Sequence, residues 1–515
     1  MNGYDYIVVG AGAAGCVLAG RLTEDPAVRV LLLEAGPPDR SRAIRMPAAL
    51  PLLFGSPYDW SYRTEPQPHA GSRRVTWPAG RTLGGSSSTN AMIHVHGHPH
   101  DYDTWRDAYH CPGWGYADLL PYLRRAAGPL RVGPPRERHR LTRAWVAAAR
   151  ATGLPAADFL GPEPDGVGFF PLNQRRGRRW SAADGYLRPA AGRPNLTVHT
   201  GARAARVTVA GGRATGVDYH RDGRPRRATA AVEVVLAAGA VGSPALLLRS
   251  GVGPAGHLAA HGIPVVVDAP AVGTGLQDHP RVTALWRVAG GGARWWARLQ
   301  WELLRRGPLA SNGGEAGGFL RTQPGLPAPD LQLLACPPPP LHPPGEPPPD
   351  PAVAVLVTAV AVGSRGRVGL RSADPDAPPL IDPGYLTDPS DLDILVAGLR
   401  LAREIAGQPP FARPTRGELA PGPELRRAEQ LRAWVRGNLV TLHHPTSTCA
   451  MGGAEAAVCD PELRVRGVAG LRVADASVMP AVPRGNTHAP TVALAERAAD
   501  LIRQSRSEDH HAAYH

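Results

Sequence analysis

The run Gly10-Ala11-Gly12-Ala13-Ala14-Gly15 decides how the first part of this chain folds. It follows a strand-like run at residues 6–9 and opens a helix of small residues that leads to a second strand-like run at residues 28–33. Strand, glycine turn, helix and strand together predict a βαβ unit in a parallel sheet. The glycines allow a tight turn, close approach of the backbone to a pyrophosphate, and close packing of the helix on the sheet.

An acidic residue completes this dinucleotide fingerprint. Glu34 ends the second strand about 20 residues after the glycines, where a carboxylate can accept hydrogen bonds from ribose hydroxyls. The amides at the start of the helix are expected to meet the phosphates. NAD and FAD both use this pattern, so it leaves the identity of the dinucleotide open. The residues expected to contact it here are Gly10, Gly12, Ala13, Ala14, Gly15, Glu34 and Ala35.

The length and composition of the chain restrict its class. With 515 residues and 54.4 kDa it is too long for one core, which predicts two domains. No apolar run approaches the roughly 20 residues that a membrane span needs. The first strand-like run starts almost at once and leaves no room for a secretory signal, so we expect a cytoplasmic protein. Five widely spaced cysteines predict neither a disulfide framework nor a metal site.

The net charge of +13 would suit a nucleic-acid partner if the basic residues formed one face. The chain contains no lysine, however, and its arginines are scattered between elements in a background rich in Ala, Gly and Pro. A local cluster, Arg175-Arg176 with Arg178-Arg179, fits a solvated loop better than a phosphate site. We therefore expect no nucleic-acid partner.

The nucleotide domain is expected to be assembled from separated segments, because strand-like runs recur at residues 196–200, 206–209, 232–237 and 471–473. Between them lies a proline-rich run at residues 337–351, which predicts a loop, followed by a strand at 353–362 and a helix at 391–405. A last helix is expected at 490–502. We assign residues 1–155, 189–280 and 430–505 to the nucleotide domain, 156–188 and 281–429 to a second domain, and 506–515 to a disordered tail.

Three further segments carry a resemblance to a known family. The first is Gly80-Arg81-Thr82-Leu83-Gly84-Gly85-Ser86-Ser87-Ser88-Thr89-Asn90, followed by Asp101-Tyr102-Asp103 and Trp105. The second is Gly239-Ala240-Val241-Gly242-Ser243-Pro244, continuing to Ser250-Gly251-Val252-Gly253. The third joins His443-His444-Pro445 to Asp475-Ala476-Ser477 and Gly485-Asn486-Thr487. In this order they resemble the glucose-methanol-choline (GMC) oxidoreductases, FAD enzymes acting mainly on alcohols, including choline dehydrogenase-like and alcohol oxidase-like members.

The resemblance implies an α/β fold, in which a Rossmann-like FAD-binding domain is interleaved with an α+β substrate domain built on a mainly antiparallel sheet. It also implies further FAD contacts. These are Arg81, Gly84, Gly85, Ser86, Thr89, Asn90, Ala91, Ala238, Gly239, Asp475, Ala476, Asn486 and Thr487. Members with covalently attached flavin carry a histidine at the position of Thr89, and threonine cannot form that bond. We therefore predict non-covalent FAD.

The chemistry implied is oxidation of an alcohol to an aldehyde or ketone by hydride transfer to flavin N5. The hydroxyl proton then needs a base, and histidine suits this role because its pKa lies near neutrality. His444 matches the family's catalytic histidine and Asn486 the second member of its catalytic pair, while His443 is expected near the substrate. An amide cannot titrate in the working range, so His444 must take the proton alone.

Glu315 matches a position where choline-oxidising members carry a carboxylate that faces the substrate. A buried acid beside an aromatic wall would suit a quaternary ammonium group. The alternative is that Glu315 only forms hydrogen bonds with loop amides. A choline-specific dehydrogenase therefore stays open beside a more general alcohol substrate.

Four histidines, His94, His96, His98 and His100, recur at every second residue. On a strand they would share one face and could bind a metal. Gly97 and Pro99 interrupt such a strand, and no cysteine or carboxylate cluster completes a site, so no metal is expected. The resemblance places this stretch beside the flavin instead, where Tyr or Arg is more usual at two of these positions.

Two other classes of function remain open at this stage. A lyase on the same fold would keep the flavin and use His444 only as an acid or base, and a non-catalytic flavin protein would use neither His444 nor Asn486. The electron acceptor, O2 or a quinone or other redox carrier, has no readable motif. A monomer and a homodimer are both compatible with the sequence.

Overall fold

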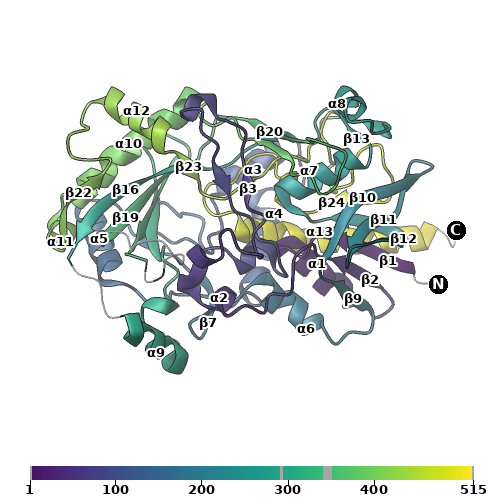
Figure 1. The fold of residues 1–515 in the computed structure, drawn as a ribbon, viewed down its shortest axis with the longest axis horizontal. Helices are drawn as coiled ribbons and strands as arrows, with labels where there is room; N and C mark the ends of the chain where they lie inside the picture. Colours follow the sequence, from purple (N-terminus) through teal and green to yellow (C-terminus); the bar gives the residue numbers. More distant parts are fainter. Residues whose placement is uncertain (1–2, 290–293, 340, 342–350, 513–515) are drawn as a thin grey trace.

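Two sheets, each with its own apolar core, organise the computed structural model (Figure 1). The structure describes residues 3–289, 294–339, 341 and 351–512. The proline-rich run expected as a loop at residues 337–351 lies mostly outside the described residues. Among the described helices, none combines the length and apolar character that crossing a bilayer would need.

The first sheet is built from distant segments of chain. Its strands are β1 (Gly3–Val9), β2 (Val30–Leu33), β9 (Leu196–His199), β10 (Ala202–Ala210), β11 (Arg213–Arg221), β12 (Arg224–Leu236) and β24 (Leu471–Val473). Their order is β10-β11-β12-β1-β2-β9, with β24 also paired to β12. β24, β12, β1, β2 and β9 are parallel, and all four residues of β2 are buried, as expected for a sheet covered on both faces. The predicted assembly from separated strands is confirmed.

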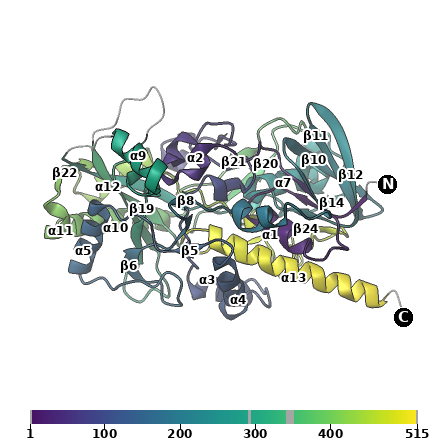
Figure 2. The same cartoon turned by 90° about the horizontal axis from the view of Figure 1, so that it is seen from below.

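Helices α1 (Ala13–Leu22) and α7 (Gly239–Arg249) follow strands of this sheet, and the long α13 (His488–Ala512) lies alongside α1 (Figure 2). Arg21 of α1 pairs with the buried Glu496 of α13 at 2.8 Å. The expected disordered tail is wrong for residues 506–512, which continue α13; residues 513–515 lie outside the described part. An ion pair between Arg506 and Asp25, which follows α1, contacts the start of this part at 3.1 Å.

The second sheet is antiparallel throughout. Its strands are β16 (Pro280–Val288), β17 (Ala316–Leu320), β18 (Leu331–Cys336), β19 (Ala352–Ala359), β22 (Thr415–Ala420) and β23 (Val440–Thr441). Their order is β17-β18-β19-β16-β22, and β23 pairs with the start of β16. Helix α10 (Pro389–Ala406) covers one face. The α/β fold class with a mainly antiparallel second sheet is therefore confirmed.

Helix α5 (Arg140–Ala151) departs from the expected domain boundary at residue 155. Leu141, Trp145 and Ala148 are spaced as one face of a helix, and all three pack in the core of the second sheet. The helix contacts α10 and α11 (Pro409–Ala412). Periodicity in the sequence identifies such an apolar face, but it does not say which of two cores the face joins.

The remaining elements are short and mostly connect the two sheets. The helices are α2 (Arg42–Arg45), α3 (Pro99–Asp107), α4 (Tyr116–Ala127), α6 (Arg188–Ala190), α8 (Ala255–Ala260), α9 (Arg294–Leu304) and α12 (Ala428–Asn438). The strands are β3 (Tyr62–Arg63), β4 (Thr76–Trp77), β5 (Val132–Gly133), β6 (Gly166–Phe169), β7 (Leu172–Arg175), β8 (Arg178–Arg179), β13 (Val252–Gly253), β14 (Val267–Asp268), β15 (Thr274–Leu276), β20 (Gly366–Gly369) and β21 (Leu380–Asp382).

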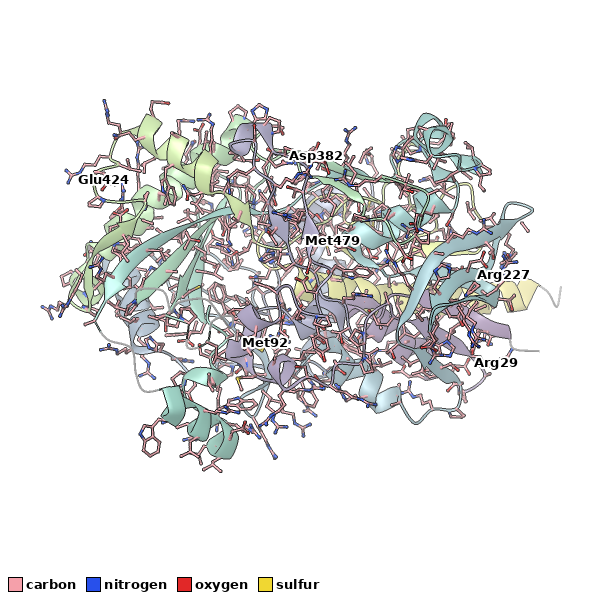
Figure 3. All side chains as sticks on the ribbon, in the orientation of Figure 1. Arg29, Met92, Arg227, Asp382, Glu424 and Met479 are labelled. Atoms are coloured by element: carbon pink, nitrogen blue, oxygen red, sulfur yellow. The ribbon has the colours of Figure 1, made fainter. Side chains whose placement is uncertain are left out.

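Figure 3 shows Met92 and Met479 in the interior, and Arg29, Arg227 and Glu424 toward the periphery.

Candidate active site

A cavity of about 1030 Å³ is lined by residues of both sheets. Val9 and Leu33 line it from the first sheet, with Glu34 directly after Leu33, whereas Leu334 and Leu356 line it from the second. We call the part around Glu34 the nucleotide end and the part around His444 the substrate end. A large pocket lined by two domains is the usual place for a cofactor with its substrate.

At the nucleotide end, the glycine turn leaves backbone donors facing open space. Gly12 caps the start of α1 without any side-chain hydrogen bond, and no acidic residue lies in the first turn. A Cβ atom on Gly12 would meet only the Ala237 carbonyl oxygen, at 3.9 Å, so the cavity side of this residue is clear. Free amides and a helix N-terminus suit a pyrophosphate. The residues present therefore fit a dinucleotide.

Glu34 stands where the ribose contact is expected. Its carboxylate accepts hydrogen bonds from the backbone amides of Ala11 at 2.9 Å and Gly36 at 2.8 Å. Burial raises the pKa of Glu34 to about 7, opposed by these two hydrogen bonds. Each carboxylate oxygen still has a lone pair that can accept from a hydroxyl group.

Most of the residues expected at the cofactor line this cavity. They are Gly10, Gly12, Ala13, Ala14, Glu34, Ala35, Arg81, Gly85, Ser86, Thr89, Asn90, Ala91, Ala238, Gly239, Asp475, Ala476, Asn486 and Thr487. Gly15 and Gly84 are not among the lining residues and are structural instead. A Cβ atom on Gly15 would lie 1.8 Å from the Gly10 carbonyl oxygen, and Gly84 has a left-handed φ of 86° that suits glycine.

Asp475 lines the cavity, but its four hydrogen bonds hold the protein together. One carboxylate oxygen accepts from the Gly239 amide at 2.8 Å and the Ser243 hydroxyl at 2.6 Å. The other accepts from the amide and the hydroxyl of Ser477, at 2.8 and 2.6 Å. Burial raises the pKa of Asp475, and these hydrogen bonds oppose that rise. The residue thereby joins β24 to the start of α7.

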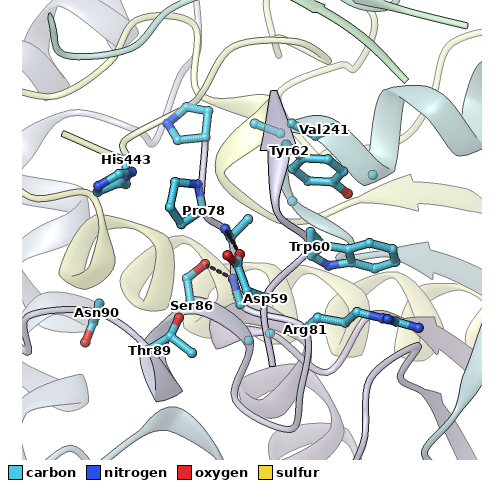
Figure 4. Close-up of a pocket in the computed structure, with 18 of the residues that line it drawn as sticks. Asp59, Trp60, Tyr62, Pro78, Arg81, Ser86, Thr89, Asn90, Val241 and His443 are labelled. Atoms are coloured by element: carbon cyan, nitrogen blue, oxygen red, sulfur yellow. Dashed lines mark hydrogen bonds between the residues drawn. The ribbon is translucent and has the colours of Figure 1, made fainter. Parts of the chain in front are cut away.

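The glycine- and serine-rich loop closes the middle of the cavity (Figure 4). The Ser86 hydroxyl accepts from the Gly80 amide at 3.1 Å, and Thr89 and Asn90 follow it along the wall. On another side of the close-up, the rings of Trp60 and Tyr62 stack with centroids 5.7 Å apart. The part of the wall from Ser86 to Asn90 is one continuous piece of chain, so the sequence analysis could identify it.

At the substrate end, His444 is held on both ring nitrogens. Its Nδ1 lies 2.9 Å from Nδ1 of His279, and its Nε2 lies 3.2 Å from Nδ2 of Asn486. Gln332 donates from Nε2 to Oδ1 of Asn486 at 3.2 Å, which fixes the orientation of that amide. The backbone amide of His444 donates to Asp278 at 2.8 Å. The predicted pair, His444 and Asn486, is therefore brought together.

These contacts determine the tautomer of His444. An amide nitrogen can only donate, so the Asn486 contact requires an unprotonated Nε2 on His444. The ring proton then sits on Nδ1 and is donated to Nδ1 of His279. Burial lowers the pKa of His444 to about 3, so the ring is neutral near pH 7. The lone pair at Nε2 accepts from the Asn486 amide here, so it becomes available to a general base only when a substrate hydroxyl takes the place of that amide.

The backbone around this histidine is unusual. His443 has φ 67° and Ser447 has φ 75°, so two residues without the freedom of glycine adopt the left-handed region on either side of His444. His443 lines the cavity with its ring exposed there, 5.7 Å from the ring of Phe54. The strained turn directs His444 inward and leaves His443 at the cavity wall.

Three functional residues were missed by the sequence analysis: Asp278, His279 and Gln332. The run Gln277-Asp278-His279-Pro280 stands at the boundary of the two domains and contains the only signal, a polar cluster just before a strand. Nothing in the sequence pairs it with His444, which lies 165 residues away from His279. Such a pairing arises only in the tertiary structure.

The structure contradicts the predicted role of Glu315 at the substrate. It is fully buried, does not line the cavity, and is bonded to the Thr142 hydroxyl at 2.7 Å and the Ser311 hydroxyl at 2.8 Å. The His139 amide also donates to it. The reason is that α5 packs against β17 and satisfies the carboxylate inside the protein. The alternative of a structural, hydrogen-bonded Glu315 describes the geometry, and the substrate-facing role does not.

His94 and His96 are also placed differently from the position beside the flavin that the resemblance implies. Both are buried, and neither lines the cavity, whose wall is formed here by Met92 and Ile93. Nδ1 of His94 lies 3.3 Å from the Asn173 amide. No group of three or more metal-ligating side chains is found within the described residues.

Comparison with known proteins identifies the family. Residues 4–281 and residues 362–495 match two models that are both described as GMC oxidoreductase. The chain belongs to the GMC oxidoreductase family. The resemblance drawn from the sequence motifs is thereby confirmed.

This GMC oxidoreductase has relatives along nearly its whole length. It is 47% identical to an uncharacterised GMC-type oxidoreductase of Mycobacterium tuberculosis, over 97% of this chain and 99% of the relative. It is 42% identical to the mitochondrial choline dehydrogenase of Homo sapiens, over 97% and 90%. A structure of Aspergillus oryzae formate oxidase, solved to study FAD modification, matches with a TM-score of 0.92 at 27% identity over 98% and 99%. FAD is the cofactor of this GMC oxidoreductase.

Proposed function

We propose that this GMC oxidoreductase oxidises an alcohol to an aldehyde or ketone, with His444 as the general base. The observation that carries the proposal is the unprotonated Nε2 of His444 in the cavity wall, beside the amide of Asn486. When bound, FAD supplies the acceptor for the hydride that leaves the alcohol carbon. A base is then needed only for the hydroxyl proton.

Each residue at the substrate end has a separate task. The substrate hydroxyl replaces the Asn486 amide at Nε2 of His444, and Nε2 then takes the hydroxyl proton while His279 holds the ring through Nδ1. The Asn486 amide, once its contact with Nε2 is replaced, can donate to the substrate oxygen. Gln332 keeps the Asn486 amide in this orientation. Because Asn486 cannot titrate, an imidazole must hold the proton.

The same proposal includes dissociable FAD, because Thr89 lines the cavity and its hydroxyl cannot replace a flavin-linking histidine. Acid precipitation tests this directly: yellow colour should leave with the supernatant. Flavin that stays on the denatured protein would contradict the prediction.

The experiment that tests the function is anaerobic reduction of the protein-bound flavin by choline, aromatic, aliphatic and sugar alcohols. We expect at least one class to bleach the flavin, which a lyase on this fold would not require. Dithionite serves as the control that the flavin can be reduced. Admission of air afterwards shows whether O2 or another carrier accepts the electrons. Flavin that stays oxidised with all four classes, while dithionite bleaches it, counts against the proposal.

A further inference from the structure

Arg281 is a charged residue at the substrate end that the proposed reaction does not use. It lines the cavity and lies near Cys336 and His443, which line the same wall. It follows His279 by two positions, and side chains two apart on an extended strand point to the same face. His279 immediately precedes β16 and its carbonyl oxygen accepts from the Leu442 amide at 2.9 Å, so His279 and Arg281 are separated by the roughly 6.6 Å that two residues span on a strand.

The position of Arg281 is fixed by neutral groups. Its Nε donates to the Thr441 carbonyl oxygen at 3.1 Å, and Nη1 donates to the Thr283 hydroxyl at 2.8 Å. No described residue accepts a hydrogen bond from Nη2. These anchors hold the guanidinium still while leaving donors for a ligand. Arginine presents such donors as a planar fork that matches a carboxylate.

The charge of Arg281 has no ion-pair partner within the described residues, and Asp278 is the one carboxylate that favours it from a distance. No described carboxylate lies within ion-pair distance of it, and its burial lowers its pKa. The nearest acid, Asp278, is engaged by the Tyr385 hydroxyl and the His444 amide. An uncompensated charge in a partly buried site costs free energy, which an anionic ligand would recover.

Each acidic side chain that lines the cavity already has a hydrogen-bond or ion-pair partner in the protein. Glu34 and Asp475 are bonded at the nucleotide end, and Asp376 pairs with Arg203 at 2.7 Å. Asp59 accepts from the Ala79 amide at 2.8 Å. A quaternary ammonium group at the substrate end would therefore meet a guanidinium and no free carboxylate.

We propose that Arg281 binds a carboxylate carried by the alcohol substrate, so that the enzyme prefers hydroxy acids to choline. The inference rests on the proposed function, because it assumes that the substrate hydroxyl lies at His444. The separation along β16 suits a carboxylate a few bonds from the alcohol carbon. Ile93, Leu334 and Leu356 line the cavity nearby and suit an apolar link between the two groups.

Anaerobic flavin reduction with charge-matched alcohols tests the inference. The series is 3-hydroxypropanoate, 4-hydroxybutanoate and 5-hydroxypentanoate, each compared with its neutral amide, and choline. We expect the best acid to exceed its amide by about 10- to 100-fold in reduction rate over Kd, since a hydrogen bond to a charged group contributes that much. Choline should be the poorest. Equal rates for acids and amides, or a preference for choline, would overturn the inference.

Variants of Arg281 test whether this residue causes the preference for hydroxy acids over their amides. Arg281→Gln should remove the advantage of the acid over the amide, and Arg281→Lys should keep part of it. The matched control is Arg416→Gln, an exposed arginine on β22 of the same sheet, which should leave the preference unchanged. Flavin content and far-ultraviolet circular dichroism show that each variant is folded. A full preference in folded Arg281→Gln would contradict the assignment.

A binding measurement separates failure of this inference from failure of the proposed function. Butanoate has no hydroxyl to oxidise, and its Kd is read from the perturbed absorbance of oxidised flavin. We expect about 10- to 100-fold weaker binding in Arg281→Gln and no change in Arg416→Gln. If butanoate binds this way but no alcohol reduces the flavin, the oxidation is wrong and the anion site stands. If alcohols reduce the flavin without this dependence, the anion site is wrong.

Discussion

The two ends of the cavity are built by different means. At the nucleotide end, Glu34 is bonded to backbone amides, and the glycine turn offers further amides, all within a short stretch of chain. At the substrate end, side chains bond to side chains across 165 residues between His279 and His444 and 154 between Gln332 and Asn486. The backbone end can hold a cofactor with little dependence on individual side chains, whereas the chemistry depends on a few of them. Substitutions should therefore separate cofactor retention from turnover.

We expect His444→Ala to separate turnover from cofactor retention most strongly. Loss of a general base lowers kcat by about 10²- to 10⁴-fold, while flavin content stays at the parent level because the nucleotide end is untouched. Stopped-flow flavin reduction and the absorbance ratio of flavin to protein measure both quantities. His220→Ala, an exposed histidine on β11, is the control and should match the parent. If His444→Ala turned over substrate at the parent rate, the claim that the chemistry depends on this side chain would be wrong.

Acid stability separates Glu34 at the nucleotide end from the buried histidines His94 and His96 outside the cavity wall, because their pKa values are shifted in opposite directions. Burial lowers the pKa of His96 to about 4 and that of His94 well below 6.5, so the unfolded state binds more protons than the folded state below pH 6.5. Their contribution is complete above pH 6.5 and is lost as the pH falls toward 4. The raised pKa of Glu34, about 7, makes its contribution fall as the pH rises from 4.5.

The measurement is the free energy of unfolding in urea between pH 5 and 6.5. The double variant His94→Gln, His96→Gln should lower the slope against pH by up to about 2.7 kcal/mol per pH unit near pH 5, since each buried histidine accounts for at most about 1.4 where its unfolded form is protonated. The control is His220→Gln, whose side chain is exposed. An unchanged slope in the double variant would show that these imidazoles accept protons within the folded state.

Gly15→Ala tests the nucleotide end alone. The added Cβ atom would lie 1.8 Å from the Gly10 carbonyl oxygen, so α1 must shift away from β1. We expect a loss of about 1–3 kcal/mol in stability, as for an overpacked core, together with reduced flavin content. Gly192→Ala is the matched control, because no atom lies within 4 Å of its Cβ position. Full flavin content in Gly15→Ala would mean that this close packing does not position the phosphate site.

The smallest expected effect is that of His279, a positioning residue. His279→Ala should lower kcat by about 10-fold, the value of one hydrogen bond, with KM for the alcohol nearly unchanged. His279→Gln should recover part of this loss, because its carbonyl can accept from Nδ1 of His444. A purely structural role predicts equal losses in both variants, which measurement of kcat, KM and the pH profile would reveal.

The sequence predicted best what local chain geometry determines. The glycine fingerprint, Glu34 and the strand Leu471–Val473 were found, because periodicity and turn chemistry are properties of short segments. His279 and Gln332 were missed, and Glu315 was assigned to the substrate, because their partners come from other parts of the fold. The resemblance supplied His444 and Asn486 as candidates, but their contact depends on tertiary structure.

The long separation in sequence between β1 and the elements β24 and α13 has a consequence for biosynthesis. Both elements complete the first sheet and its helical layer, and Asp475, Asn486 and Thr487 complete the cavity wall. A ribosome must therefore translate as far as α13 before the nucleotide domain can close. Until then the early βαβ segment emerges with its apolar layer uncovered, which exposes the nascent protein to aggregation and makes chaperone supply important for producing it.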